Sequence, residues 1–129
     1  MKITKIKIFF TIIAVLVLGT IITVVSRNST PTIPGKYDEF ATCIKDKGAV
    51  FYGAFWCSHC NATKAMFGTS KDLLPYVECS TKDLKGQLQV CKDKGIMGYP
   101  TWEFADGSRL TGEVSFESLA EKTSCVLPQ

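Results

Sequence analysis

The feature that most constrains this chain is a pair of cysteines at the point where a strand is expected to give way to a helix. Residues 49–55 form a continuous apolar run, which is typical of a strand buried on both faces. Cys57 and Cys60 follow in a C-x-x-C spacing, and residues 58–67 are expected to form a helix that stops at Gly68. The pattern therefore predicts a buried strand followed by a helix, with Cys57 at the helix N-terminus.

The rest of residues 37–129 alternates between helical and strand patterns. A recurrence of apolar residues at helical spacing predicts helices, and an Asp-Gly pair between two short strands predicts a hairpin. The further predicted elements are a helix at 38–47, a strand at 76–79, a helix at 83–94, a hairpin of 102–104 with 109–111, and a helix that starts at Ser115. This order is typical of an α/β domain with a mixed four-stranded sheet and helices on both faces.

The N-terminal segment has a different composition. Residues 8–25 carry no charge and would span about 27 Å as a helix, close to the thickness of a bilayer core. Three lysines precede this run, so residues 1–27 are expected to form a single transmembrane helix with the N-terminus in the cytoplasm. A cleaved signal peptide is the alternative. Either one places the domain at 37–129 in the periplasm or the extracellular space, behind a linker at 28–36.

The charge balance argues against a nucleic-acid partner. The chain holds 15 Lys and Arg against 12 Asp and Glu, and four of the basic residues precede residue 31. The remainder is close to neutral and has no basic stripe of the kind that a phosphate backbone requires. Binding to nucleic acid is therefore not expected.

The chemistry expected of the C-x-x-C is thiol–disulfide exchange, which needs one thiol that attacks and a second that resolves the mixed disulfide. A helix N-terminus favours a thiolate, so Cys57 is the expected nucleophile and Cys60, one turn later, the resolving thiol. A cationic His59 would stabilise the reduced protein and so make the disulfide more oxidising. The alternative is that His59 is a solvated residue without effect. Trp56 is expected to form an apolar wall beside the site.

Four further cysteines lie outside this motif. All six fall between residues 43 and 125, an even number that implies pairing in an oxidising compartment, although six cysteines allow 15 pairings. From their places on the predicted elements we expect structural disulfides Cys79–Cys91 and Cys43–Cys125. A redox-active relay that feeds Cys57 and Cys60 is the alternative role for such a pair.

Two segments together resemble the thioredoxin superfamily. They are Trp56-Cys57-Ser58-His59-Cys60 and Tyr99-Pro100-Thr101. The resemblance implies a thioredoxin-like fold, and a histidine before the second cysteine resembles DsbA and protein disulfide isomerase. It also implies a cis Tyr99–Pro100 bond that faces the C-x-x-C, where the backbone at Tyr99 pairs with a substrate strand.

A closer resemblance covers about residues 40–125. Residues 51–57, 74–80 and 98–107 resemble the thioredoxin-like domain fused to bacterial vitamin K epoxide reductase homologues. That resemblance implies a domain that donates disulfides to exported, cysteine-containing proteins. A separate membrane partner of the vitamin K epoxide reductase type would re-oxidise it. No cofactor is expected in this chain beyond the Cys57–Cys60 disulfide, because the quinone would belong to the partner.

One position departs from the thioredoxin pattern, and it leaves the direction of exchange open. Thioredoxins place a buried acid six residues before the first cysteine to move protons at the resolving thiol, and Phe51 occupies that position here. This departure puts a reductase role in more doubt than an oxidase role. A disulfide reductase or isomerase is nevertheless the alternative within the same chemistry.

Two functions other than thiol–disulfide exchange are alternatives. Cys57, His59 and Cys60 are soft ligands that a copper- or zinc-binding module could use. Three ligands within four residues do not make a closed tetrahedral site, so no metal site is predicted. An inert, disulfide-stapled scaffold is the other possibility, and it fits poorly with a Trp-Cys-x-x-Cys at a strand–helix junction.

Overall fold

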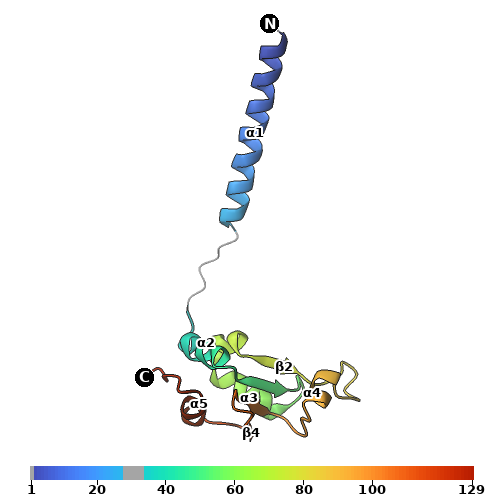
Figure 1. Ribbon diagram of the computed structural model, residues 1–129, viewed down its shortest axis with the longest axis vertical. Coiled ribbons are helices and arrows are strands. Elements are labelled where there is room, and N and C mark those ends of the chain that lie inside the picture. Colours follow the sequence, from blue (N-terminus) through green and yellow to red (C-terminus); the bar gives the residue numbers. More distant parts are fainter. Residues whose placement is uncertain (1, 28–33) are drawn as a thin grey trace. The chain divides into compact units, whose positions relative to one another are not determined.

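The structure is a computed structural model that describes residues 2–27 and 34–129. The chain divides into two compact units, Met1–Ile33 and Pro34–Gln129, and each is described by itself. Figure 1 labels their helices and strands.

The first unit contains one helix, α1 (Lys2–Arg27). Across residues 2–27 and 34–129, no helix combines the length and the apolarity needed to cross a membrane. This finding corrects the expected transmembrane helix at 1–27 and, with it, the expected single-pass topology and localisation. The expectation rested on the length of the run at 8–25 and on its lack of charge. The predicted linker at 28–36 lies mostly outside the described residues.

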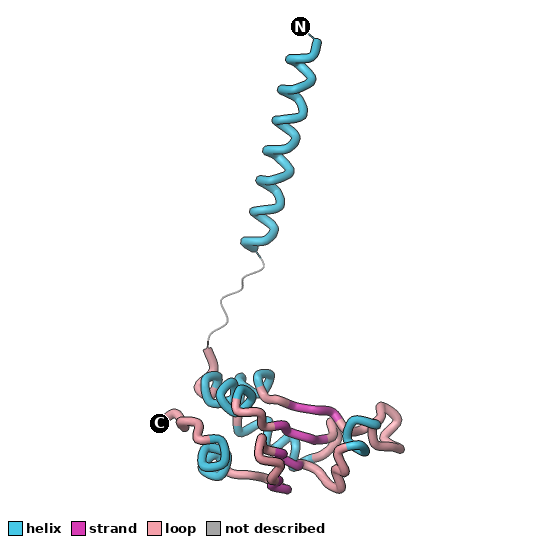
Figure 2. Tube along the Cα trace, in the orientation of Figure 1, coloured by secondary structure: helices cyan, strands magenta, loops and turns pink. Residues whose placement is uncertain are grey.

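The second unit is built on a four-stranded mixed sheet, as the sequence predicts (Figure 2). Its strands are β1 (Val50–Gly53), β2 (Tyr76–Glu78), β3 (Thr101–Glu103) and β4 (Arg109–Thr111), in the order β2-β1-β3-β4. β1 pairs in parallel with β2 and antiparallel with β3, and β3 pairs antiparallel with β4. The C-terminal end of the central strand β1 therefore leads directly to the cysteine motif.

Two hydrophobic clusters pack on the sheet because successive side chains of β1 point to opposite faces. Phe51 is fully buried and stacks on Trp102, with ring centroids 4.7 Å apart. Its cluster includes Phe40, Leu119, Cys57 and Cys60, and so ties the C-x-x-C to the larger core. Tyr52, the next residue, belongs to a smaller cluster on the other face, with Cys79, Cys91 and Ile96.

Five helical segments surround the sheet. They are α2 (Asp38–Asp46), α3 (Ser58–Met66), the 3-10 helix η1 (Gly68–Leu73), α4 (Gln89–Asp93) and α5 (Phe116–Thr123). Ser115 caps α5 by accepting a hydrogen bond from the backbone N–H of Ser118. Each element other than η1 falls within or close to its predicted range, with one exception.

The helix predicted at 83–94 is wrong over its first half, because α4 begins only at Gln89. The Thr81 hydroxyl donates to the Asp83 carboxylate and accepts from the Gly86 N–H, and Leu84 has a positive φ of 63°. Side-chain hydrogen bonds to nearby backbone compete with helix formation, and here they stabilise a turn. The apolar spacing of residues 84, 88 and 91 does not reveal this competition.

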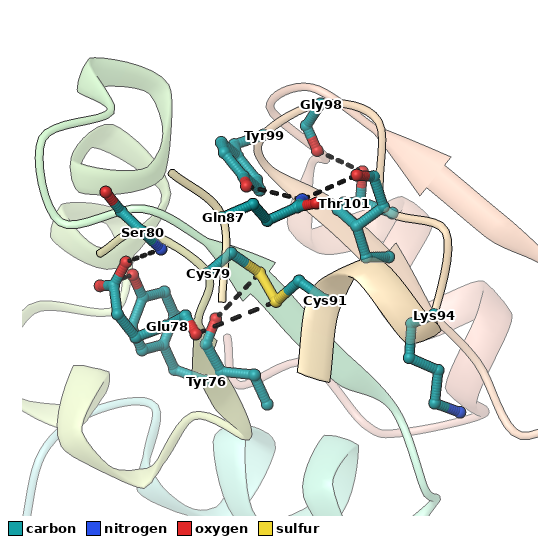
Figure 3. The surroundings of a disulfide bond; sticks show 12 residues. Tyr76, Glu78, Cys79, Ser80, Gln87, Cys91, Lys94, Gly98, Tyr99 and Thr101 are labelled. Carbon is teal, nitrogen blue, oxygen red and sulfur yellow. Dashed lines mark hydrogen bonds between the residues drawn. A yellow bond between two sulfur atoms is a disulfide. The ribbon is translucent and has the colours of Figure 1, made fainter. Parts of the chain in front are cut away.

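Two disulfides fasten the fold, and they join the same pairs that the sequence suggests. Cys43 on α2 is bonded to Cys125, just after α5, with Cα atoms 6.0 Å apart. Cys79, at the end of β2, is bonded to Cys91 on α4, with Cα atoms 5.6 Å apart. Figure 3 shows the second bond among the side chains of β2, α4 and the segment before β3.

Candidate active site

Cys57 occupies the turn between β1 and α3 and is the N-cap residue of that helix. Its backbone is extended, with φ −73° and ψ 117°, and its Sγ accepts a hydrogen bond of 3.2 Å from the backbone N–H of Cys60. The sulfur thus takes the place that a serine or aspartate oxygen commonly fills at a helix start. Unpaired N–H groups and the helix dipole at this position favour a negative charge on the capping atom.

Cys60 lies on the inner side of the same turn. Both cysteines of the motif are free thiols, but Cys60 is fully buried and Cys57 keeps 6% of its surface exposed. Burial raises the pKa of the Cys60 thiol to about 12, and its hydrogen bond with Cys57 acts in the same direction. Cys60 therefore holds its proton at neutral pH, as a resolving thiol must until the mixed disulfide forms.

His59 faces a partner that the sequence did not indicate. Its Nδ1 lies 2.6 Å from Oε1 of Glu113, in the segment between β4 and α5, and both side chains are substantially exposed. Because a carboxylate only accepts, Nδ1 carries the proton of this hydrogen bond. Glu113 is 54 residues away from His59, and no sequence pattern links the two. An electrostatic effect of His59 on Cys57 stays a prediction.

Two aromatic side chains flank Cys57. Trp56 is about half exposed, and its Nε1–H donates to Oγ of Ser80 at 2.7 Å. The Trp56 and Tyr99 rings meet edge to face with centroids 6.2 Å apart, and the Tyr99 hydroxyl accepts from Nε2 of Gln87 (Figure 3). Ser80 and Gln87 both lie beside the Cys79–Cys91 region, so this disulfide region supports both aromatic walls.

An open cavity of about 560 Å³ lies between these walls. The Tyr99–Pro100 peptide bond next to it is cis, the conformation that the resemblance implied. The cavity can receive a polypeptide segment next to the Cys57 sulfur. Its lining consists of Trp56, Cys57, Ser58, His59, Met97, Gly98 and Tyr99.

The metal-binding alternative finds no support in residues 2–27 and 34–129, because no three His, Cys, Asp or Glu side chains converge there in a way that could hold an ion. His59, the only histidine of the chain, is engaged with Glu113.

No protein-family model matches the chain. The chain is 46% identical over 87 residues to the Arabidopsis thaliana protein named thiol-disulfide oxidoreductase LTO1. The match covers 64% of this chain and 23% of the relative, so the chain spans about a quarter of that longer protein. The chain therefore contains a domain similar to part of that thiol-disulfide oxidoreductase.

Proposed function

We propose that this protein is a thiol–disulfide oxidoreductase that donates its Cys57–Cys60 disulfide to cysteine-containing proteins. The observation that carries the proposal is the Cys57 sulfur, which caps α3 and borders an open cavity while Cys60 is buried behind it. This arrangement gives the two thiols the unequal roles that exchange requires.

The proposed reaction proceeds in two exchanges. A substrate thiolate attacks Sγ of Cys57 in the oxidised protein, the bond to Cys60 breaks, and Cys60 takes the electron pair and a proton. A second substrate thiolate then attacks the substrate sulfur of the mixed disulfide, and Cys57 leaves as a thiolate. The substrate is oxidised by two electrons and the protein is reduced by the same two electrons.

The neighbouring residues have supporting roles in this proposal. Trp56 and Tyr99 bound the cavity that receives the substrate segment, and the buried Pro100 follows Tyr99 through the cis bond. His59 favours the Cys57 thiolate by its charge, and Glu113 sets the position of its ring. Stabilising the thiolate stabilises the reduced protein, which makes the disulfide a stronger oxidant.

Continued donation requires a partner that re-oxidises the protein. We propose a separate membrane enzyme of the vitamin K epoxide reductase type, which would pass the two electrons on to a quinone, and exported proteins as the substrates. The resemblance of residues 51–57, 74–80 and 98–107 to domains fused to such enzymes supports this choice. In this scheme the chain itself needs no bound cofactor.

The test is a covalent trap in cells. In a Cys60→Ser variant the Cys57 thiolate can still attack a disulfide of the re-oxidising partner or of an oxidised substrate, and no Cys60 thiol remains to resolve the mixed disulfide, so these proteins should stay bonded to Cys57. We expect mass spectrometry to identify a quinone-linked membrane enzyme together with proteins that carry disulfides.

The control is the Cys57→Ser/Cys60→Ser double variant, which should capture nothing. Capture of only those proteins that hold non-native disulfides would favour an isomerase or reductase instead. An absence of any trapped partner would contradict disulfide exchange altogether.

A further inference from the structure

The sulfur of Cys60 and the ring of Tyr76 both lie next to the backbone of Gly53, the last residue of β1. A Cβ atom at Gly53 would lie 2.8 Å from Cε2 of Tyr76 and 3.1 Å from Sγ of Cys60. Only a residue without a side chain leaves room for both groups. The buried thiol of the motif is therefore in the immediate neighbourhood of the β2 side chains.

A lysine from α3 lies over that ring. Lys64 is four residues after Cys60, one helical turn along the same face. Its Nζ lies 3.3 Å from the centroid of the Tyr76 ring. The ammonium group is thus held at the ring that neighbours Cys60, where the charges of Lys64 and Cys60 interact, while the half-buried side chain keeps contact with solvent.

The other polar side chains around the Tyr76 ring already form hydrogen bonds. Glu78 accepts hydrogen bonds from the Tyr76 hydroxyl at 2.7 Å and from the Ser80 N–H at 2.8 Å (Figure 3). It also accepts one from the Phe55 N–H at 3.3 Å. Burial, and then the hydrogen bond to Glu78, raises the pKa of Tyr76, so its hydroxyl keeps its proton. Lys64 is left as the group that can exchange a proton with Cys60.

We propose that Lys64 is the proton donor and acceptor for Cys60, in the role that a buried acid fills in thioredoxins. The position of that acid is taken by Phe51, whose ring is fully buried against Trp102. This inference rests on the proposed exchange reaction and names the residue that handles its proton.

The electrostatics of the cluster give this transfer its direction. Burial lowers the pKa of Lys64, and the charges of Glu78, Cys60 and Cys57 oppose this only in part, while Lys71 adds to the lowering. Burial raises the pKa of Cys60 to about 12. A proton therefore passes downhill from the Lys64 ammonium to a Cys60 thiolate.

The proton balance of the first exchange follows. As a substrate thiolate bonds to Sγ of Cys57, the Cys57–Cys60 bond breaks and Cys60 leaves with the electron pair. Lys64 gives this sulfur a proton and becomes a neutral amine. It regains a proton from water through a cavity of about 400 Å³ that Lys64, Lys71 and Tyr76 help to line. In the reverse reaction the amine takes the proton from Cys60.

The experiment measures how fast dithiothreitol reduces the oxidised full-length protein, followed by tryptophan fluorescence. Rates are divided by the thiolate concentration of the reagent at each pH, from about pH 6 to pH 10.5, which reaches the ordinary lysine pKa of about 10.4 and so covers a lowered one. We expect the wild-type value to fall at alkaline pH as Lys64 loses its proton. A Lys64→Met variant should be at least about tenfold slower at neutral pH and should lack this fall.

Two further variants separate charge from proton transfer. Lys64→Arg keeps the positive charge but does not titrate in this range, so it should also lack the alkaline fall. Lys92→Met, an exposed lysine on α4 outside this cavity, should keep the wild-type rate and profile.

An unchanged rate and profile in Lys64→Met, or an alkaline fall that persists in Lys64→Arg, would overturn the assignment of Lys64 while leaving the exchange reaction intact. Failure of the wild-type disulfide to react with the thiol would instead contradict the proposed function.

Discussion

The Cys57–Cys60 pair and the two disulfides of the fold differ in their surroundings rather than in their burial. Cys60, Cys79 and Cys91 are all fully buried, and Cys57 and Cys125 have the same 6% exposure. Exposure alone would therefore not tell an exchanging cysteine from a structural one. The difference lies in which parts of the chain each disulfide joins and in whether its sulfur borders an open cavity.

The structural disulfides join elements that are separate in the chain. Cys43–Cys125 spans 82 residues and Cys79–Cys91 spans 12, so each restricts a loop of the unfolded chain. Cys57 and Cys60 lie in one helical turn, and Cys57 borders an open cavity. Opening a bond within one turn releases no long loop, so this pair can cycle while the fold persists.

The largest expected difference between the two kinds of pair is in exchange activity. Cys57→Ser should abolish the oxidation of a dithiol peptide, because no other thiol borders the cavity in the described part of the chain. The matched control is the Cys43→Ala/Cys125→Ala double variant, which should retain activity as long as it is folded. Full activity in Cys57→Ser would show that exchange takes place elsewhere.

Removing a structural disulfide, in contrast, should lower the stability of the fold. In the chain-entropy model, losing Cys43–Cys125 costs about 4.5 kcal/mol of unfolding free energy and losing Cys79–Cys91 about 3 kcal/mol. Urea denaturation of the two double alanine variants measures both values. A variant that loses exchange without losing stability would point to a redox relay rather than a structural bond.

The Cys60 thiol should make the stability of the reduced protein depend on alkaline pH. Its pKa is raised from 9.0 to about 12, so above pH 9 the unfolded chain releases this proton while the folded protein retains it. Stability should fall as pH rises from 9 to 12, by at most about 1.4 kcal/mol per pH unit.

A Cys60→Ala variant should lack this contribution, so the difference in slope between it and the reduced wild type isolates Cys60. Equal slopes in urea titrations across this range would contradict the tight retention of the proton.

The smallest expected effect concerns Glu113. Removing its carboxylate takes away the partner that positions His59 and favours its cationic form, so the Cys57 thiolate and the reduced protein lose stabilisation. An exposed ion pair contributes about 0.2–1 kcal/mol, so Glu113→Gln should lower the reduction potential by about 5–20 mV. Glu117→Gln, on α5, is the matched control and should leave the potential unchanged, whereas an equal shift in both variants would indicate a general effect of charge.

The sequence was most informative where chemistry and local structure coincide. The apolar run at 49–55 and the helix stop at Gly68 predicted the bounds of β1 and α3 closely. The C-x-x-C spacing predicted that both sulfurs lie in one helical turn. Lys64 could have been found by its four-residue spacing from Cys60. The Glu113–His59 contact could not, because it depends on how the segment after β4 packs against α3.

Two expectations failed for physical reasons of different kinds. The helix at 83–94 competes with side-chain hydrogen bonds of Thr81 and Asp83, which a count of apolar positions does not include. The transmembrane helix rested on length and absence of charge, and no helix among residues 2–27 and 34–129 has the required combination of length and apolarity.

The central claim, that only Cys57 and Cys60 exchange and that they do so as an oxidant, can be measured directly. The full-length protein is equilibrated in glutathione redox buffers, and mass spectrometry after alkylation gives the oxidised fraction of each cysteine pair. We expect Cys57–Cys60 to titrate at about −120 to −180 mV, the range of DsbA and protein disulfide isomerase, while the other two disulfides stay oxidised. Reduction of all three pairs together, or a Cys57–Cys60 potential near −270 mV as in thioredoxin, would contradict the claim.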